Sequence, residues 1–424
     1  MKLPYTEVRI DAKGAWAEPD ELKAAADLLA AHAATDVLIL CHGWNNTPGD
    51  ARALYERLVA SLDAVRDAVP GTRRRQFAVI GVIWPSIQWS PPENSGAGAG
   101  ADTSTDLLRS EIRTKVTDAA ARRRLLALAD RLDHDPEAAI QFVEVLRTTL
   151  PRTTKGEDAG AFRIFRSAPA SEVLDAVRGG GTEADAPAAV GGAAVLDVAA
   201  PMDAADGGGA GLFSSLIDAA RNALNIATYY TMKERAGVVG RKGIARLLER
   251  LHADRPEARL HLVGHSFGGR AVTAATDATK ARVFSLTLLQ AAFSHFGMAE
   301  NWDGAGTDGL FVGVPAKVAG PVLVTFTRND TAVGLAYAIA SRLARQIGAA
   351  IGDENDPYGG IGRNGALKTP ASLPPGKLRA VGGAYAFAPG RVASLNADAF
   401  ISSHSDVTGR HVAYALLRAV DSTG

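Results

Sequence analysis

The feature that most constrains the fold is a series of short, continuous apolar runs separated by helical patterns. Residues 36–41 (DVLILC) and 76–84 (QFAVIGVIW) are too short for core helices and are bounded by turn residues, so both are predicted to be buried strands. A helical pattern over residues 50–68 lies between them. Strand, helix and strand in this order predict an α/β protein with a parallel sheet covered by helices on both faces.

The same alternation is found near both ends of the chain. A short strand and a helix are predicted at 6–10 and 21–32. In the second half, the pattern predicts a helix that includes 243–252, strands at 259–263, 285–291 and 322–327 with helices between them, and a final helix at 407–420. The last strand is placed either at 377–381 or at 391–397.

A long segment interrupts the alternation. It starts with the loop-like stretch PPENSGAGAGADTSTD, continues with helical patterns at 105–132 and 136–150, and includes a Gly/Ala/Asp-rich tract at 179–211. We therefore predict a core formed by 1–89 and 225–424 and a mostly helical inserted region, 90–224, with flexible Gly/Ala-rich segments. Apolar residues at helical spacing near its end indicate core packing, with a pocket lining as the alternative: Phe213, Leu216, Ile217, Leu224, Tyr229 and Tyr230.

Charge and cysteine content narrow the classes of partner. Lysine plus arginine equals aspartate plus glutamate at 46 each, so no net charge attracts nucleic acid, and the arginine run 73–75 is expected on a solvated face. The single cysteine, Cys41, excludes an internal disulfide. No run of about 18 apolar residues predicts a membrane span, and the first residues carry charge where a signal peptide needs an apolar core. We expect a cytoplasmic protein with a small-molecule substrate; the sequence leaves its oligomeric state open.

The segment that indicates chemistry is Gly264-His265-Ser266-Phe267-Gly268, which follows an apolar strand and opens a helical pattern. In G-x-S-x-G at such a strand-to-helix turn, the serine hydroxyl is exposed, and the two glycines lack side chains that would collide. The helix N-terminus offers free N–H groups to an anion. Ser266 is predicted to be a nucleophile, with a simple tight turn as the alternative.

A serine nucleophile needs a histidine that is oriented by a carboxylate. A strand-to-helix turn that carries the nucleophilic serine is called a nucleophile elbow. In proteins with such an elbow, the acid and then the base follow the serine in the chain. Asp330 comes directly after a predicted strand and is our acid, with capping of the next helix as the alternative. His404, in the loop before the last helix, is our base, with a simple loop histidine as the alternative. His295 precedes Asp330, and His411 falls inside the final helix.

The oxyanion site requires two N–H groups. The backbone N–H of Phe267 supplies one, and the loop after the strand at 36–41 supplies the other, where Gly43 lets the main chain approach and Trp44 presents its N–H. An ordinary turn is the alternative for this loop. Gly43 and His265 are expected to contact the substrate. His42 precedes the serine and is expected to be structural.

These motifs together resemble the α/β-hydrolase superfamily: HGW at 42–44, GHSFGG at 264–269, RND at 328–330 and SHSD at 403–406. The resemblance covers about 36–89 and 224–420. It implies a mainly parallel sheet flanked by helices, with the insertion in the position of a cap or lid. It also implies a triad of Ser266, Asp330 and His404 and an oxyanion hole from the amides of Trp44 and Phe267.

The expected reaction is hydrolysis of a carboxylic ester through an acyl-enzyme intermediate, which needs no metal or organic cofactor. Amidase, thioesterase or acyltransferase activity with the same triad is the first alternative. A non-catalytic, hydrolase-like binding module is the second. The identity of the acyl and alcohol groups depends on the insertion, whose fold the sequence does not give.

Overall fold

The computed structural model describes residues 3–86, 104–157, 159–178, 210–330 and 359–424. Its described strands form one parallel sheet in the order β1-β3-β2-β4-β5-β6-β8-β7. The strands are β1 (Tyr5–Arg9), β2 (Asp36–Cys41), β3 (Phe77–Ile83), β4 (Arg259–His265), β5 (Val283–Leu289), β6 (Val322–Phe326), β7 (Gly376–Lys377) and β8 (Val392–Asn396). The predicted α/β class with a parallel sheet is confirmed.

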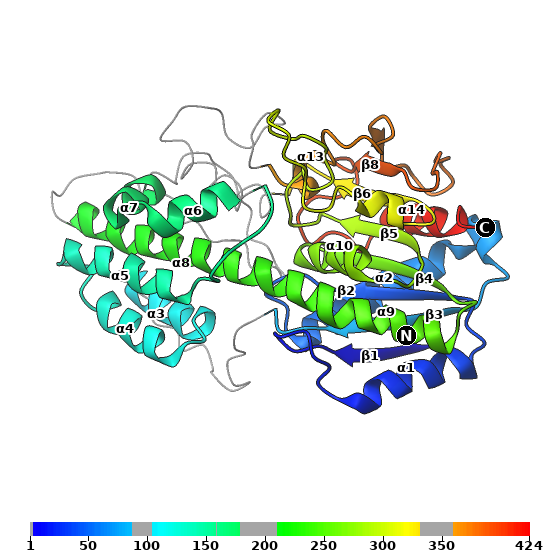
Figure 1. The fold of residues 1–424 in the computed structure, drawn as a ribbon, viewed down its shortest axis with the longest axis horizontal. Helices are drawn as coiled ribbons and strands as arrows, with labels where there is room; N and C mark the ends of the chain where they lie inside the picture. Colours follow the sequence, from blue (N-terminus) through cyan, green and yellow to red (C-terminus); the bar gives the residue numbers. More distant parts are fainter. Residues whose placement is uncertain (1–2, 87–103, 158, 179–209, 331–358) are drawn as a thin grey trace.

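The helices cover both faces of this sheet (Figure 1). Along β2, Val37 and Ile39 belong to one apolar cluster and Leu38 and Leu40 to another, as the two-residue period of a strand requires. The first cluster is completed by α1 (Pro19–Ala31), α9 (Ala245–Asp254) and α10 (Phe267–Ala278), and the second by α2 (Pro48–Val65) and α14 (Arg410–Asp421).

Short helical turns complete the core. They are the 3₁₀ turns Arg66–Ala68 and Pro70–Thr72 and the helices α11 (Val314–Lys317) and α13 (Ile361–Asn364). Of the two predicted positions for the last strand, 391–397 carries β8, which lies inside the sheet. The position 377–381 is wrong except for Lys377, which ends the two-residue edge strand β7.

Between β3 and β4 the chain forms a helical bundle beside the sheet (Figure 1). It consists of α3 (Ser104–Lys115), α4 (Ala119–Ala129), α5 (Pro136–Thr149), α6 (Ala159–Ser167), α7 (Ala170–Arg178) and α8 (Ala210–Val238). Helices α3, α5 and α7 pack against α8, and α4 packs against α3 and α5. The helical stretch expected at 105–132 is divided into α3 and α4. The division occurs because Asp118 caps α4, where its carboxylate accepts a hydrogen bond from the Ala121 N–H (2.7 Å).

A continuous helical rod joins the bundle to the sheet. Helix α8 runs through a π-helical turn, Val239–Ile244, directly into α9, so the boundary expected at 224/225 falls inside a helix. The turn packs tightly on α10, since a Cβ at Gly240 would lie 2.1 Å from the Ala271 carbonyl oxygen. Trp16 Nε1 donates to the Gly243 carbonyl (3.3 Å), a partner that suits the altered hydrogen bonding of a π turn.

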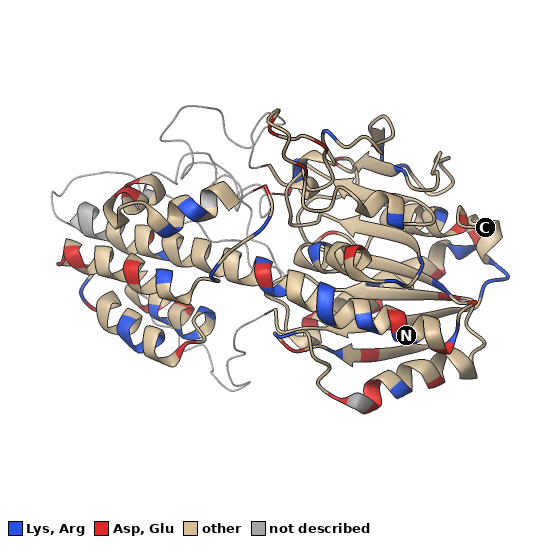
Figure 2. Ribbon diagram, viewed as in Figure 1, with Lys and Arg blue, Asp and Glu red and all other residues tan. Residues whose placement is uncertain are grey.

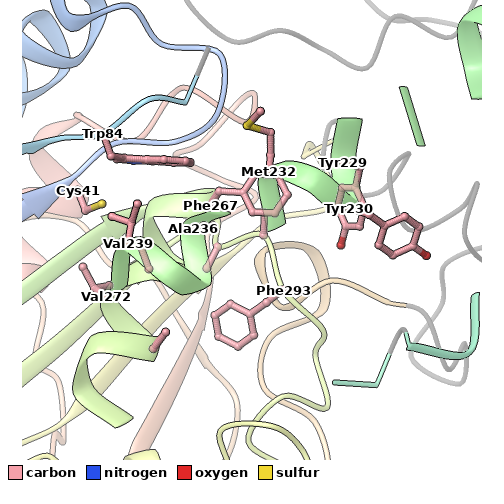
Figure 3. Packing of buried hydrophobic residues seen from close by; sticks show 14 of the residues in the cluster. Cys41, Trp84, Tyr229, Tyr230, Met232, Ala236, Val239, Phe267, Val272 and Phe293 are labelled. Carbon is pink, nitrogen blue, oxygen red and sulfur yellow. The ribbon is translucent and has the colours of Figure 1, made fainter. Parts of the chain in front are cut away.

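The apolar side chains of α8 pack against α10. Figure 3 shows Tyr229, Met232 and Ala236 of α8 beside Phe267, and all four are buried. The expected packing is confirmed for the described side chains of the set, which lie in the main apolar cluster: Leu216, Ile217, Leu224, Tyr229 and Tyr230. The Phe213 side chain lies outside the described residues.

Charged residues of both signs are interspersed over the sheet and the bundle (Figure 2), in line with the balanced composition. Among the described helices, none combines the length and the apolar character needed to cross a bilayer.

The expectation that the arginines at 73–75 share a solvated face is wrong for Arg75. Its side chain is 8% exposed and donates to Asp36 Oδ1 (2.9 Å) and to the Val420 carbonyl (3.0 Å). Asp36 also contacts His261 Nε2 (3.1 Å), and His261 Nδ1 contacts Ser285 Oγ (2.8 Å). This buried network joins three strands to the end of α14, and its partners are too distant in sequence to be expected.

Candidate active site

Ser266 occupies a strained turn between β4 and α10. The expectation of an exposed hydroxyl is wrong, since Ser266 is only 6% exposed. Its backbone has φ 55° and ψ −126°, a conformation that residues with a Cβ rarely adopt. The turn is fixed by hydrogen bonds to the neighbouring chain: the Ser266 N–H donates to the Leu289 carbonyl (3.1 Å), and the Ser266 carbonyl accepts from the N–H groups of Gly269 (2.9 Å) and Ala292 (3.0 Å). The segment after β5 therefore holds Ser266 in place.

The glycines of the motif are required by close packing at this turn. A Cβ at Gly264 would lie 2.4 Å from the Gly268 carbonyl oxygen, and a Cβ at Gly268 would lie 2.1 Å from that of Cys41. Any larger residue at either position would separate β4, α10 and the end of β2. The sequence pattern and the packing thus agree on why these two residues are glycine.

The structure brings the predicted acid and base together. Asp330 follows β6 and is fully buried, and His404 lies in the loop before α14. The distance between Asp330 Oδ2 and His404 Nδ1 is 2.8 Å. The helix expected after Asp330, which was the basis for the capping alternative, lies outside the described residues.

The loop that carries His404 lies against the elbow. His265 Nε2 contacts the His404 carbonyl oxygen (2.9 Å), and the two imidazole rings lie 4.8 Å apart. In the described part of the chain, Ser266 Oγ and His404 are not joined by a hydrogen bond. Catalytic hydrogen bonds in ligand-free sites are often long and shorten only when substrate binds.

Two further polar side chains connect the segment after β6, which carries Asp330, to the loop after β8, which carries His404 and is called the base loop below. Asn329 Nδ2 donates to the Ile401 carbonyl (2.8 Å), and Asp398 Oδ1 accepts from Thr327 Oγ1 and the Arg328 N–H, both at 2.9 Å. We did not expect either residue at the site. The signal for Asp398 was present, because it follows β8 at the same sheet edge at which Asp330 follows β6.

Within the loop, Asp406 Oδ2 accepts hydrogen bonds from Ser402, at 3.0 Å from its N–H and at 2.9 Å from its hydroxyl. These bonds close the five-residue segment around His404. The motif SSHSD therefore supplies both the candidate base and the groups that shape its loop.

The loop after β2 reaches the nucleophile through Gly43. A Cβ at this position would lie 2.7 Å from Ser266 Cβ and 3.3 Å from Ser266 Oγ, so the main chain there is in contact with the serine. The N–H groups of Trp44 and Phe267 donate to no other group in the described ranges. Both predicted oxyanion donors thus retain a free N–H.

Ser86, just after β3, supports this loop and was not expected. The Asn45 N–H donates to the Ser86 carbonyl (3.2 Å), the Asn46 N–H donates to Ser86 Oγ (3.2 Å), and Ser86 Oγ donates to the Asn46 carbonyl (2.9 Å). Asn45 has a positive φ of 57°, a conformation that asparagine tolerates better than most residues. The loop is therefore held in a defined shape beside Ser266.

His42 is structural, as its position before the serine indicates. It is buried, its Nε2 accepts from the Trp84 N–H (3.2 Å), and its Nδ1 therefore carries the proton toward the Gly43 carbonyl (2.9 Å). Burial lowers the pKa of His42 to about 4, so the ring is neutral at pH 7. Cys41 is buried beside it, and burial raises the pKa of its thiol, which leaves it unreactive.

The two remaining histidines after the serine have other partners than the Asp330–His404 pair in the contacts of the described residues. His295 is buried, and its Nδ1 accepts from Asn364 Nδ2 (3.0 Å). His411 stacks on Phe400, with ring centroids 4.1 Å apart. Within the described ranges, no cluster of three or more His, Cys, Asp or Glu residues is arranged to hold a metal ion.

No protein-family model, curated protein or solved structure matches this chain. A strained serine, a carboxylate–histidine pair beside it and two free amides are the groups that nucleophilic acyl transfer requires.

Proposed function

We propose that this chain is a serine hydrolase of the α/β-hydrolase type that cleaves carboxylic esters. The observation that carries the proposal is the Asp330–His404 hydrogen bond, formed by a loop that also lies against the Ser266 elbow. The order of the three residues along the chain, serine, acid and base, is that of α/β-hydrolases.

In this proposal Ser266 Oγ attacks the ester carbonyl carbon while His404 Nε2 accepts its proton. Asp330 holds Nδ1–H and stabilises the imidazolium that forms. The N–H groups of Trp44 and Phe267 donate to the oxyanion. His404 then protonates the leaving alkoxide, and the acyl-enzyme is hydrolysed by a water molecule that His404 deprotonates in the same way.

The substrate preference of the proposed hydrolase depends on the helical bundle. It follows β3 and is joined to the elbow helix by the α8 rod, so it would act as the cap that shapes the substrate pocket. The same catalytic groups also serve amides, thioesters and acyl transfer to another nucleophile. Competent residues at all three triad positions favour an enzyme over a binding module.

The test uses p-nitrophenyl esters of increasing acyl length with the whole protein and with Ser266→Ala. We expect hydrolysis that falls by about 10³-fold or more in the variant. Ser61→Ala, a half-buried position on α2, is the control and should retain full activity. Hydrolysis that is equal in Ser266→Ala and the intact protein would overturn the proposal.

A further inference from the structure

We infer that His265 is a positioning residue, whose ring holds the backbone of His404 so that the base is presented to Ser266. This inference rests on the proposed function. The pattern G-x-S-x-G leaves the second position open, and in this chain a histidine fills it. His265 is 6% exposed, so its side chain contacts the protein rather than bulk solvent.

The hydrogen bond fixes the tautomer of His265. A carbonyl oxygen only accepts, so at 2.9 Å from the His404 carbonyl the Nε2 atom must carry the proton. Nδ1 then bears no proton, and this buried atom has no hydrogen-bond partner in the described part of the chain. Burial lowers the pKa of His265 to about 3, so the neutral ring keeps this donor at pH 7.

Three segments of the site meet at this ring. His265 is covalently joined to Ser266, its ring lies 4.8 Å from that of His404, and a Cβ at Gly43 would lie 3.3 Å from its Nδ1. The His265 side chain therefore contacts the elbow, the loop that carries His404 and the loop that carries Gly43, and fixes their positions relative to one another. Both ring nitrogens lie in the protein interior, which favours this role over the direct substrate contact expected from the sequence.

The role predicts a particular kinetic signature. If His265 acts through His404, its loss displaces the base and slows the chemical step, while ester binding changes little. A displacement of about 1 Å at a catalytic group costs about 10²-fold in rate. A residue that only fills space would lower the stability of the fold without this selective effect.

The experiment compares His265→Leu, His265→Asn and His265→Gln. The readouts are kcat and KM for a p-nitrophenyl ester and the rate of phosphonylation by a fluorophosphonate. A Gln amide can place its NH₂ near the position of Nε2, whereas Asn is too short and Leu has no donor. We expect kcat and phosphonylation to fall about 10²-fold in Leu and Asn with KM within about twofold, and Gln to recover most of the loss.

His261→Gln is the matched control, because His261 is also a buried histidine on β4 but lies at the opposite end, against Asp36 and Ser285. It should lower the melting temperature without a selective loss of kcat. The inference is overturned if the folded Asn or Leu variant keeps the intact rate, or if Gln restores nothing. Failure of the proposed function has a different signature, since the unaltered protein would then not be phosphonylated at Ser266.

Discussion

The buried carboxylate of Asp330 accepts a hydrogen bond from His404 Nδ1 at 2.8 Å, which leaves His404 Nε2 as the proton acceptor. The NH₂ group of an asparagine can donate to His404 Nδ1 and so favour the tautomer that carries the proton on Nε2, which cannot accept the proton of Ser266. We therefore expect Asp330→Asn to lower kcat/KM by about 10³- to 10⁴-fold while the protein stays folded. Ester hydrolysis and circular dichroism check this. Asp67→Asn, at a fully exposed carboxylate, should leave kcat/KM unchanged.

Gly43 gives a second prediction. A methyl group there would press on Ser266 at 2.7 Å from its Cβ, so Gly43→Ala should reduce kcat by about 10²-fold or more through displacement of the serine or the oxyanion loop. Gly49→Ala is the control, since its nearest neighbour would lie at an ordinary 3.5 Å. Equal kcat values for the two variants would show that the Gly43 loop has no role in the reaction.

The strained backbone at Ser266 predicts that a glycine there raises the free energy of unfolding while activity is lost. A residue with a Cβ at φ 55° and ψ −126° costs of order 1–3 kcal/mol, and glycine relieves that cost. Ser266→Gly should therefore have a free energy of unfolding about 1 kcal/mol above that of Ser266→Ala, with both variants inactive. Urea denaturation measures the difference, and an equal or lower value for the glycine variant would argue against strain.

Histidines that burial keeps neutral make the fold sensitive to acid. Burial lowers the pKa of His42 to about 4 and that of His265 to about 3, whereas the unfolded chain binds these protons below about pH 6.5. The unfolded state thus binds more protons, so stability present above pH 6.5 is lost as the pH falls toward 4 and 3. Between pH 7 and pH 5, each histidine should remove about 2 kcal/mol from the free energy of unfolding. Denaturation at both pH values should show a smaller loss in His265→Gln.

The sheet and the contact between Asp330 and His404 were predictable because their signals are local or ordered along the chain. After Asp36, β2 is apolar from Val37 to Cys41, and the elbow motif lies directly between an apolar strand and a helix. Asp330 was chosen because it follows a buried strand after the serine, and His404 because it follows the acid in the loop before the last helix. The structure places these two side chains in contact, although 74 residues separate them.

The contacts that the sequence did not reveal depend on segments that meet only in the folded chain. The pairing of Arg75 with Asp36, the support of the oxyanion loop by Ser86, and the bond from Asn329 to the base loop have no local pattern. The π turn that joins α8 to α9 is a related case. Glycine disfavours helix formation, yet Gly240 lets this turn approach α10 closely because it has no side chain.

The central claim is that Ser266 is a nucleophile activated by His404. Its most direct test is reaction of the intact protein with a fluorophosphonate, followed by mass spectrometry of the whole chain and its peptides. We predict one added phosphonyl group, on the peptide that contains Ser266, and a rate reduced by about 10³-fold or more in His404→Ala. An unmodified protein, or an adduct on another residue that forms equally fast in Ser266→Ala, would contradict the claim.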